Sequence, residues 1–280
     1  MAFSEGFLRN FLQRAVTGII FVVVVACAFI LGPYTYAIIM TSIITIASIE
    51  YNRLLRAGGY SPHMFMALGI NVVAFTLGFL VNVNGLDYRM LFIVVGLVWA
   101  MFLVELFSAN KDPLANIALT MLCCAYVGMP FALFNLLAFK GDAYDYHPII
   151  GLFALVWVND TGAYLTGVTL GRHKLYERIS PKKTIEGFVG GILLTMLVGW
   201  ISYHFFDDFF FHAGRTFALL SAGIVAVVGT AGDLIESMFK RSVSIKDSGR
   251  ILPGHGGVLD RFDAVIFVAP IISLLYYFFT

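Results

Sequence analysis

The segment from Asp233 to Asp263 carries side chains suited to metal and phosphate chemistry. Its carboxylates are Asp233, Glu236, Asp247, Asp260 and Asp263. Its cations are Lys240, Arg241, Lys246, Arg250 and Arg261. Clustered carboxylates repel one another unless they are protonated or bridged by cations, and hard oxygen ligands facing phosphate are a common environment for magnesium. The composition therefore predicts a site that holds a metal ion and a phosphate. The alternative, a network of salt bridges, leaves the neighbouring glycines and His255 without explanation.

The spacing within this segment predicts how its side chains are presented. Positions separated by three, four, seven and eight residues share one face of a helix. Asp233, Glu236, Ser237, Lys240 and Arg241 follow this spacing. The segment from Lys246 to Gly257 is rich in glycine, including Gly256 and Gly257, so its backbone N–H groups can approach a ligand closely. Asp260 and Asp263 then lie one turn apart at the start of the next helix.

Two upstream segments are expected to complete the site. Asn159 and Asp160 interrupt an apolar run, where a central aspartate costs about 2.5 to 3.5 kcal/mol and needs a function or a partner to offset it. Ser180 followed by Pro181 predicts a helix start. Lys182 and Lys183 would then lie in the first helical turn, where they oppose the helix dipole unless an anion binds there. The alternative role for these lysines is to set topology or to contact anionic lipid headgroups.

Two glutamates in the first half are also placed in apolar runs. Glu50 and Glu105 lie toward the ends of the expected second and fourth spans. Snorkelling to the interface, or an arginine partner such as Arg53, can satisfy both carboxylates. We therefore favour a structural role for them.

The elements that position these groups are expected to be membrane helices. The chain has 280 residues, of which 60% are hydrophobic and 12% charged, and its mean hydropathy is +0.88. A helix needs about 20 apolar residues to cross the hydrocarbon core. Candidate spans cover residues 15–32, 34–52, 63–82, 89–107, 114–138, 147–168, 186–206, 216–236 and 262–279. The sequence predicts an all-α, polytopic integral membrane helix bundle with about nine transmembrane helices.

The distribution of basic residues predicts the orientation. If the N-terminus is cytoplasmic, all but three of the 18 lysines and arginines face the cytoplasm. The exceptions are Arg89, Lys140 and Arg215. This asymmetry fits the positive-inside rule with the C-terminus outside, and it places the charged segment in the cytoplasm. The net charge of +1 gives no indication of nucleic-acid binding.

The two halves of the chain differ in their content of reactive side chains, although no linker separates them. Residues 1–145 are expected to form N-terminal transmembrane scaffold helices. Residues 146–280 are expected to form a catalytic transmembrane region with cytoplasmic loops. We find no internal repeat and no linker long enough to separate soluble domains, so both regions belong to one continuous membrane domain.

The polar residues from Ser237 to Asp263 resemble the signature of the CDP-diacylglycerol synthases, or phosphatidate cytidylyltransferases. The match runs through Ser-Met-Phe-Lys-Arg at 237–241, Lys-Asp-Ser-Gly at 246–249 and Leu-Pro-Gly-His-Gly-Gly-Val-Leu-Asp-Arg-Phe-Asp at 252–263 without a gap. The resemblance extends upstream to residues 159–164 and 179–187, so it covers the second half of the chain. Such a long pattern of polar positions is far more specific than a lone glycine motif.

The resemblance implies a nucleotidyltransferase that converts CTP and phosphatidate to CDP-diacylglycerol and pyrophosphate for phospholipid synthesis. It implies dependence on magnesium, with a second cation as an option, and an active site at the cytoplasmic face of the cell (inner) membrane. A homodimer is a reasonable expectation for this family. Two polyanionic substrates must meet in such a reaction, so metal ions and cations are needed to suppress their repulsion.

We expect the following roles. Asp233, Asp247 and Asp260 are the main metal-site carboxylates, with Asp263 and Glu236 as ligands or close supports. The residues expected to bind substrate are Asn159, Asp160, Lys182, Lys183, Ser237, Lys240, Arg241, Arg250, Gly256 and Gly257. The catalytic set comprises Lys246, Asp247, His255, Asp260 and Arg261. His255 is expected to position or contact phosphate rather than to act as an obligatory base.

Two other functions remain open at this point. A CTP-dependent lipid kinase of the dolichol kinase type is distantly similar in this region and would transfer the γ-phosphate instead. An ion-coupled transporter would use Asp160 in an ion path, although no inverted repeat is visible.

Overall fold

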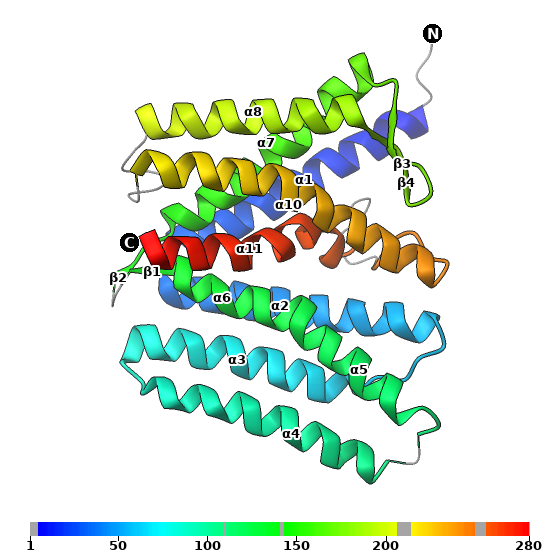
Figure 1. The fold of residues 1–280 in the computed structure, drawn as a ribbon, viewed down its shortest axis with the longest axis vertical. Helices are drawn as coiled ribbons and strands as arrows, with labels where there is room; N and C mark the ends of the chain where they lie inside the picture. Colours follow the sequence, from blue (N-terminus) through cyan, green and yellow to red (C-terminus); the bar gives the residue numbers. More distant parts are fainter. Residues whose placement is uncertain (1–4, 109, 141–142, 206–213, 250–255, 280) are drawn as a thin grey trace.

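The computed structural model describes residues 5–108, 110–140, 143–205, 214–249 and 256–279. Over these ranges the chain is a bundle of long helices with two short antiparallel strand pairs (Figure 1). The helices are α1 (Glu5–Ile30), α2 (Pro33–Ala57), α3 (Met64–Asn84), α4 (Phe92–Leu106), α5 (Pro113–Cys123), α6 (Met129–Ala138), α7 (His147–Leu170), α8 (Ile185–Phe205), α10 (Gly214–Ser242) and α11 (Leu259–Phe279). A short 3-10 helix, η1 (Tyr88–Leu91), precedes α4, and a π-helical turn, η2 (Cys124–Gly128), joins α5 to α6. The strand pairs are β1 (Phe139–Lys140) with β2 (Ala143–Tyr144), and β3 (Lys174–Tyr176) with β4 (Ser180–Thr184).

The prediction of an all-α membrane bundle is confirmed. Among the described residues, eight helical segments are long and apolar enough to cross a membrane, each matching one of the expected spans from the second to the ninth. One of them runs through α5, η2 and α6 as a single segment, Pro113–Ala138. The expected first span falls on α1, whose apolar section, Val16–Ile30, is shorter than the other eight. The orientation of the bundle across the membrane stays a prediction.

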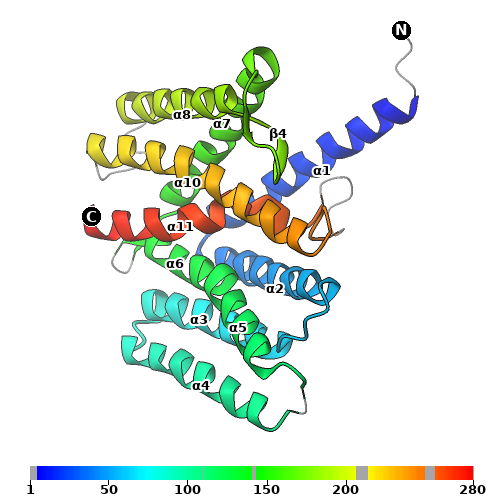
Figure 2. The same ribbon diagram turned by 45° about the vertical axis from the view of Figure 1, so that its right-hand side comes forward.

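The helices stack in a fixed order that separates the two halves of the chain. Figures 1 and 2 show α8, α10 and α11 following one another, then α6 and α2 at one level, and then α3 and α4 at the far end of the bundle. The pairs α7·α8, α10·α11 and α8·α10 have the most extensive contacts in the second half, and α11 also packs against α6. Helix α11 is therefore central, with α7, α8 and α10 on one side and α6, α2, α3 and α4 on the other, whereas α1 lies on the side of α7 and α10 (Figures 1 and 2).

Small residues allow α7 and α8 to pack closely. A Cβ on Gly187 would lie 2.7 Å from the Ala163 carbonyl oxygen, and one on Gly191 would lie 2.7 Å from Asn159 Oδ1. Such distances exclude any side chain larger than hydrogen. The glycines of α8 therefore let the backbone of α7 approach closely.

Aromatic packing fixes the start of α11. Phe262 is fully buried, and its ring meets those of Phe131 at 5.5 Å and Phe153 at 5.7 Å, both edge to face. Edge-to-face aromatic pairs are favourable beyond the area that they bury. Because Phe262 lies between Asp260 and Asp263, its packing fixes the part of α11 that carries both carboxylates.

Candidate active site

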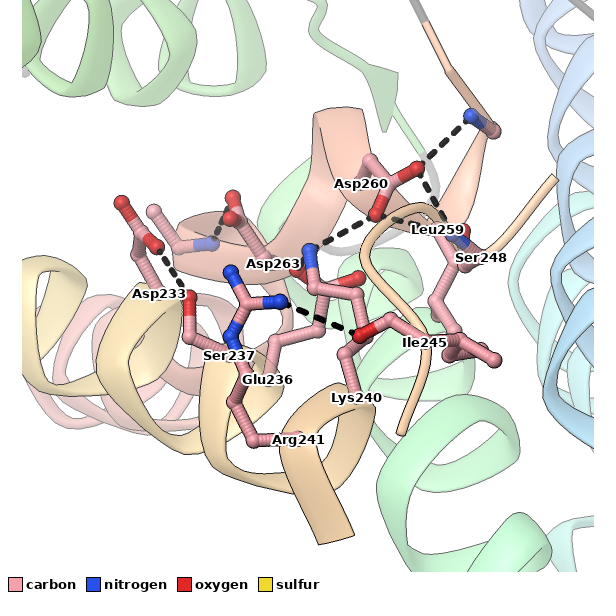
Figure 3. Close-up of polar contacts among 12 residues, drawn as sticks. Asp233, Glu236, Ser237, Lys240, Arg241, Ile245, Ser248, Leu259, Asp260 and Asp263 are labelled. Atoms are coloured by element: carbon pink, nitrogen blue, oxygen red, sulfur yellow. Dashed lines mark hydrogen bonds and ion pairs between the residues drawn. The ribbon is translucent and has the colours of Figure 1, made fainter. Parts of the chain in front are cut away.

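A buried lysine joins two carboxylates at the centre of the charged segment. Lys240 Nζ lies 2.7 Å from Glu236 Oε2, one turn away on α10, and 2.8 Å from Asp260 Oδ1 on α11 (Figure 3). The Lys240, Glu236 and Asp260 side chains are 13%, 1% and 7% exposed. Buried charges of this kind persist only when they are paired and hydrogen-bonded. Lys240 therefore bridges two carboxylates that come from two different helices.

Asp260 also organises the glycine-rich loop. Its Oδ2 accepts the Ser248 N–H at 3.0 Å and the Gly257 N–H at 2.8 Å, so the two ends of the loop meet at one carboxylate (Figure 3). Gly256 has φ +84, a left-handed conformation that side chains rarely adopt, and a Cβ there would lie 2.7 Å from Asp260 Oδ2. The loop thus requires glycine at this position for two independent reasons. At Ser248 and Gly257 the backbone N–H groups bind Asp260, so they are not free for a ligand.

A second group of carboxylates lies one helical turn away from the first. Asp233 Oδ2 forms an ion pair with Lys183 Nζ at 2.7 Å, and Ser237 Oγ donates to Asp233 Oδ1 at 3.3 Å. Asp263 Oδ1 accepts the N–H of the next residue at 2.7 Å. The carboxylates of Asp160, Asp233 and Asp263 repel one another in all three pairings. Three carboxylates therefore converge from α7, α10 and α11.

Lys240 and Asp260 of the first group and the three aspartates of the second line one cavity of about 450 Å³. The charged residues in its lining are Asp160, Asp233, Lys240, Asp247, Asp260, Arg261 and Asp263. A second cavity of about 380 Å³ lies between α7, β4, α8 and α10 and shares Asp160 and Asp233 with the first. Its lining combines Lys182 and Lys183 with apolar side chains such as Phe188. The two cavities meet at a pair of aspartates.

The expected helix start at Ser180 is wrong. Ser180–Thr184 is strand β4, which pairs with β3 through Lys174 opposite Thr184, and α8 begins at Ile185. Glu186, in the first turn of α8, also fixes the segment that leads into β3. Its Oε2 accepts the Arg172 N–H at 3.0 Å, and its Oε1 contacts His173 Nδ1 at 2.6 Å. Lys182 and Lys183 therefore reach the second cavity from a strand and not from a helix N-terminus.

The remaining expected site residues fall into three groups. Asn159 is 2% exposed, and its Nδ2 donates to Thr230 Oγ1 at 3.4 Å, so it joins α7 to α10. Arg241 and Lys246 are exposed, and Arg241 Nη1 donates to the Ile245 carbonyl at 3.3 Å. Arg250 and His255 lie outside the described residues. The helical face predicted from Asp233 to Arg241 is present on α10, although Arg241 turns away to the loop.

The carboxylates of the site are chemically suited to magnesium, although they do not form a complete coordination shell. No group of three or more histidine, cysteine, aspartate or glutamate side chains in the described part of the chain is arranged to hold a metal ion. Asp160, Asp233 and Asp263 nevertheless repel one another at the wall of a single cavity. Magnesium typically takes one or two carboxylates and completes its shell with water and phosphate oxygens. Glu236 and Asp260 are less suited, since both already form ion pairs with Lys240.

The sequence interpretation missed contributions from the first half of the chain. Thr17, Gly18 and Phe21 of α1 line the main cavity. Glu50 of α2 does not snorkel: it is completely buried, and its Oε2 accepts the Leu259 N–H at 2.8 Å. The cost of burying a carboxylate was a signal that Glu50 needed a partner, but nothing local in the sequence identified Leu259. Nothing in the apolar run of α1 distinguishes its cavity-lining residues from lipid-facing ones.

The fold and the site together define a multi-pass membrane protein with an acidic and basic cavity suited to phosphate chemistry. The family model described as "Cytidylyltransferase family" matches residues 12–279, so the chain belongs to the cytidylyltransferase family. This membership confirms the resemblance seen in the residues from Ser237 to Asp263.

Three relatives give the extent of the similarity, and each is named phosphatidate cytidylyltransferase. The protein of Staphylococcus haemolyticus is 44% identical over 60% of this chain, and the matched segment spans 62% of that relative's length, just under two thirds. The protein of Staphylococcus epidermidis is 43% identical over 64% of this chain and 68% of its own. The protein of Staphylococcus saprophyticus is 37% identical over 76% of this chain and 78% of its own.

Proposed function

We propose that this protein is a phosphatidate cytidylyltransferase, which transfers a cytidylyl group from CTP to phosphatidate in the presence of magnesium. The observation that carries the proposal is the main cavity, in which Asp160, Asp233 and Asp263 stand beside Lys240 and Arg261. Such a cavity suits a reaction between two polyanions, because it supplies carboxylates for a divalent cation and cations for phosphate. The names of the relatives favour cytidylyl transfer over the kinase and transporter alternatives.

The proposed reaction is a single displacement at phosphorus. A phosphate oxygen of phosphatidate attacks the α-phosphorus of CTP, the bond from that phosphorus to the bridging oxygen of the β-phosphate breaks, and pyrophosphate leaves. A phosphate monoester is already largely ionised near neutral pH, so the step needs no strong general base. The work of the protein is positioning and charge stabilisation.

We assign the cation and the phosphates to different parts of the site. Asp233 and Asp263, with Asp160 beside them, are the carboxylates proposed to hold magnesium, and Asp247 at the cavity wall is a further ligand candidate. Bound magnesium supplies positive charge that offsets the charge on the phosphates and on leaving pyrophosphate.

The cations of the site are proposed to bind phosphate from two sides. Lys183, on β4, and Arg261, on α11, both interact favourably with the Asp160 carboxylate. Lys182, Lys246, Arg250 and His255 remain candidates for phosphate contacts. Asp260 and Glu236 are proposed to hold Lys240 and the loop rather than to bind the metal directly.

The second cavity is proposed to receive the lipid. It opens among helices α7, α8 and α10 and combines apolar side chains such as Tyr164, Val168 and Phe188 with Lys183 and Asp233. An acyl chain would contact the apolar wall while the phosphate reaches the shared aspartates. This arrangement lets the lipid remain in the bilayer during the reaction.

We further propose that the site faces the cytoplasm of the cell (inner) membrane and that the chain forms a homodimer. The orientation is supported by the uneven distribution of lysine and arginine. Labelling of single cysteines introduced at Lys174 and Lys140 in intact cells tests the orientation, because only the residue on the outer side reacts with a membrane-impermeant maleimide. Light scattering of the purified protein measures the number of protomers.

The function is tested by product analysis with radiolabelled CTP. Purified protein in vesicles that contain phosphatidate should form a CDP-lipid and pyrophosphate with magnesium and should form neither with excess chelator. Phosphorylated lipid and CDP as products would identify a kinase, and no consumption of CTP would refute the proposal. Asp247→Asn should abolish turnover, whereas Asp112→Asn, at an exposed position before α5, should behave as the unmodified protein.

A further inference from the structure

Glu50 is a buried carboxylate that joins the first half of the chain to the loop of the candidate site. It lies in α2 and is 0% exposed. Its Oε2 accepts the N–H of Leu259, the first residue of α11, at 2.8 Å, across 209 residues of sequence. A carboxylate at a helix N-terminus interacts favourably with the free N–H groups and the helix dipole. Glu50 therefore acts as the N-terminal cap of α11, supplied by another helix.

Two glycines that precede Leu259, Gly249 and Gly257, lie against this carboxylate. Gly249 and Gly257 have no positive φ, so their backbone conformation is open to other residues. Space is the limitation: a Cβ on Gly249 would collide with Glu50 Oε1 and lie 2.7 Å from Glu50 Cδ. A Cβ on Gly257 would collide with Ser248 Oγ and lie 2.8 Å from Glu50 Cδ. At Gly249 the space is taken by Glu50 alone, and at Gly257 it is taken by Glu50 and Ser248 together.

The same loop residues bind a second carboxylate on the side of the cavity. The N–H groups of Ser248 and Gly257 donate to Asp260 at 3.0 Å and 2.8 Å, and Asp260 pairs with Lys240. The two ends of the loop are therefore held between Glu50, which is buried, and Asp260, which lines the cavity. Glu50 itself is not among the residues that line the cavity, so its connection to the cavity runs through these backbone N–H groups.

We propose that Glu50 is a positioning residue for the proposed reaction, which sets the positions of Gly249, Gly257 and Leu259 and through them the orientation of Asp260 and Lys240. Its effect on turnover rests on the proposed function, whereas its effect on the loop does not.

A second buried glutamate provides a matched control. Glu105, at the end of α4, is 4% exposed and contacts His63 Nε2, and its oxygens accept from Asn116 Nδ2 at 3.2 Å and Ser108 Oγ at 3.0 Å. All of these partners lie in or beside α3, α4 and α5, away from the loop and the two cavities. Loss of Glu105 should affect stability without affecting the site.

The kinetic test compares Glu50→Ala, Glu50→Gln and Glu105→Ala, each normalised to the amount of folded protein. Loss of the buried charge-assisted hydrogen bond in Glu50→Ala should lower kcat about 10- to 100-fold with a smaller change in KM. The amide of Glu50→Gln still accepts the Leu259 N–H and should keep kcat within about threefold. Glu105→Ala should leave kcat per folded molecule unchanged. Equal kcat for Glu50→Ala and the unmodified protein would overturn the proposal.

Hydrogen exchange provides a readout that does not depend on activity. In Glu50→Ala the amides of Ser248, Gly257 and Leu259 should exchange at least about tenfold faster, because their protection reflects local opening of the loop. In Glu105→Ala they should exchange as in the unmodified protein. Unchanged protection in Glu50→Ala refutes the positioning role. If the unmodified protein fails to turn over CTP, the proposed function fails, but this comparison still decides the inference.

A double-mutant cycle tests the spatial argument directly. Gly249→Ala should lower kcat strongly when Glu50 is present, because its methyl group collides with the carboxylate. In the Glu50→Ala background that collision is gone, so adding Gly249→Ala should cost little more. Equal costs of Gly249→Ala in both backgrounds would show that Glu50 does not shape the loop.

Discussion

Lys240 offers the sharpest test of the charge arrangement. Lys240→Met keeps an unbranched side chain one atom shorter and removes the charge that pairs with Glu236 at 2.7 Å and Asp260 at 2.8 Å. Both carboxylates would then remain in surroundings where their side chains are 1% and 7% exposed. The prediction is that this variant loses much of its stability as well as its activity.

The expected cost follows from the geometry. Two opposite unit charges about 4 Å apart at an effective dielectric near 20 attract by about 4 kcal/mol. Part of this attraction offsets the desolvation of Lys240, and removing one member of a buried pair costs about 3 to 5 kcal/mol in measured cases. With about 2 to 4 °C per kcal/mol for a chain of this size class, the apparent Tm should fall by about 6 to 20 °C.

Thermal unfolding in a mild detergent measures the loss, and a second substitution identifies its cause. Adding Glu236→Gln to Lys240→Met removes one of the two uncompensated charges and should restore about half of the lost Tm. Lys111→Met, at an exposed position before α5, is the control and should leave Tm unchanged. A Tm within about 2 °C of the unmodified protein for Lys240→Met, or no recovery on adding Glu236→Gln, would refute the reasoning.

Three further predictions concern the rest of the site. Lys183→Met removes a partly exposed ion pair, so the Tm should change by less than about 4 °C, while CTP incorporation at saturating substrate falls at least about tenfold; equal activity would remove Lys183 from the site. Gly256→Ala combines the strain of φ +84 with a collision between the new Cβ and Asp260. Gly214→Ala introduces only the strain of φ +87, because the space around it is open. Activity assays should therefore show a loss in Gly256→Ala and none in Gly214→Ala. Asp160→Asn should raise the magnesium concentration for half-maximal activity about tenfold in a magnesium titration, and an unchanged titration would exclude Asp160 from the cation site.

The membrane spans were predictable because the bilayer imposes a strong local rule. About 20 apolar residues are needed to cross it, and the composition of the segments Met64–Asn84 and Leu259–Phe279 meets this requirement. The charged face of α10 was predictable for a similar reason, since Asp233, Ser237 and Lys240 are related by helical spacing alone.

The features that were missed depend on contacts between distant segments. Ser180 and Pro181 form a sound helix-start signal, but pairing with β3 and the hydrogen bonds of Glu186 hold the backbone extended until Ile185. The partner of Glu50 lies 209 residues away, beyond any local pattern. The division into a scaffold before residue 145 and a catalytic region after it stays a prediction, although Phe21 of α1 lines the main cavity.

The contact between Glu50 and Leu259 also bears on how the protein is made. The 209 residues that separate them correspond to about 10 to 40 s of translation at 5 to 20 residues per second. Throughout this interval α2 is already synthesised, but the helix that its glutamate caps does not yet exist. The carboxylate must stay hydrated or neutral until α11 leaves the ribosome. Closure of the bundle around Glu50 is therefore a late step in biogenesis, and a chain truncated before α11 should be recognised as incomplete by membrane quality control.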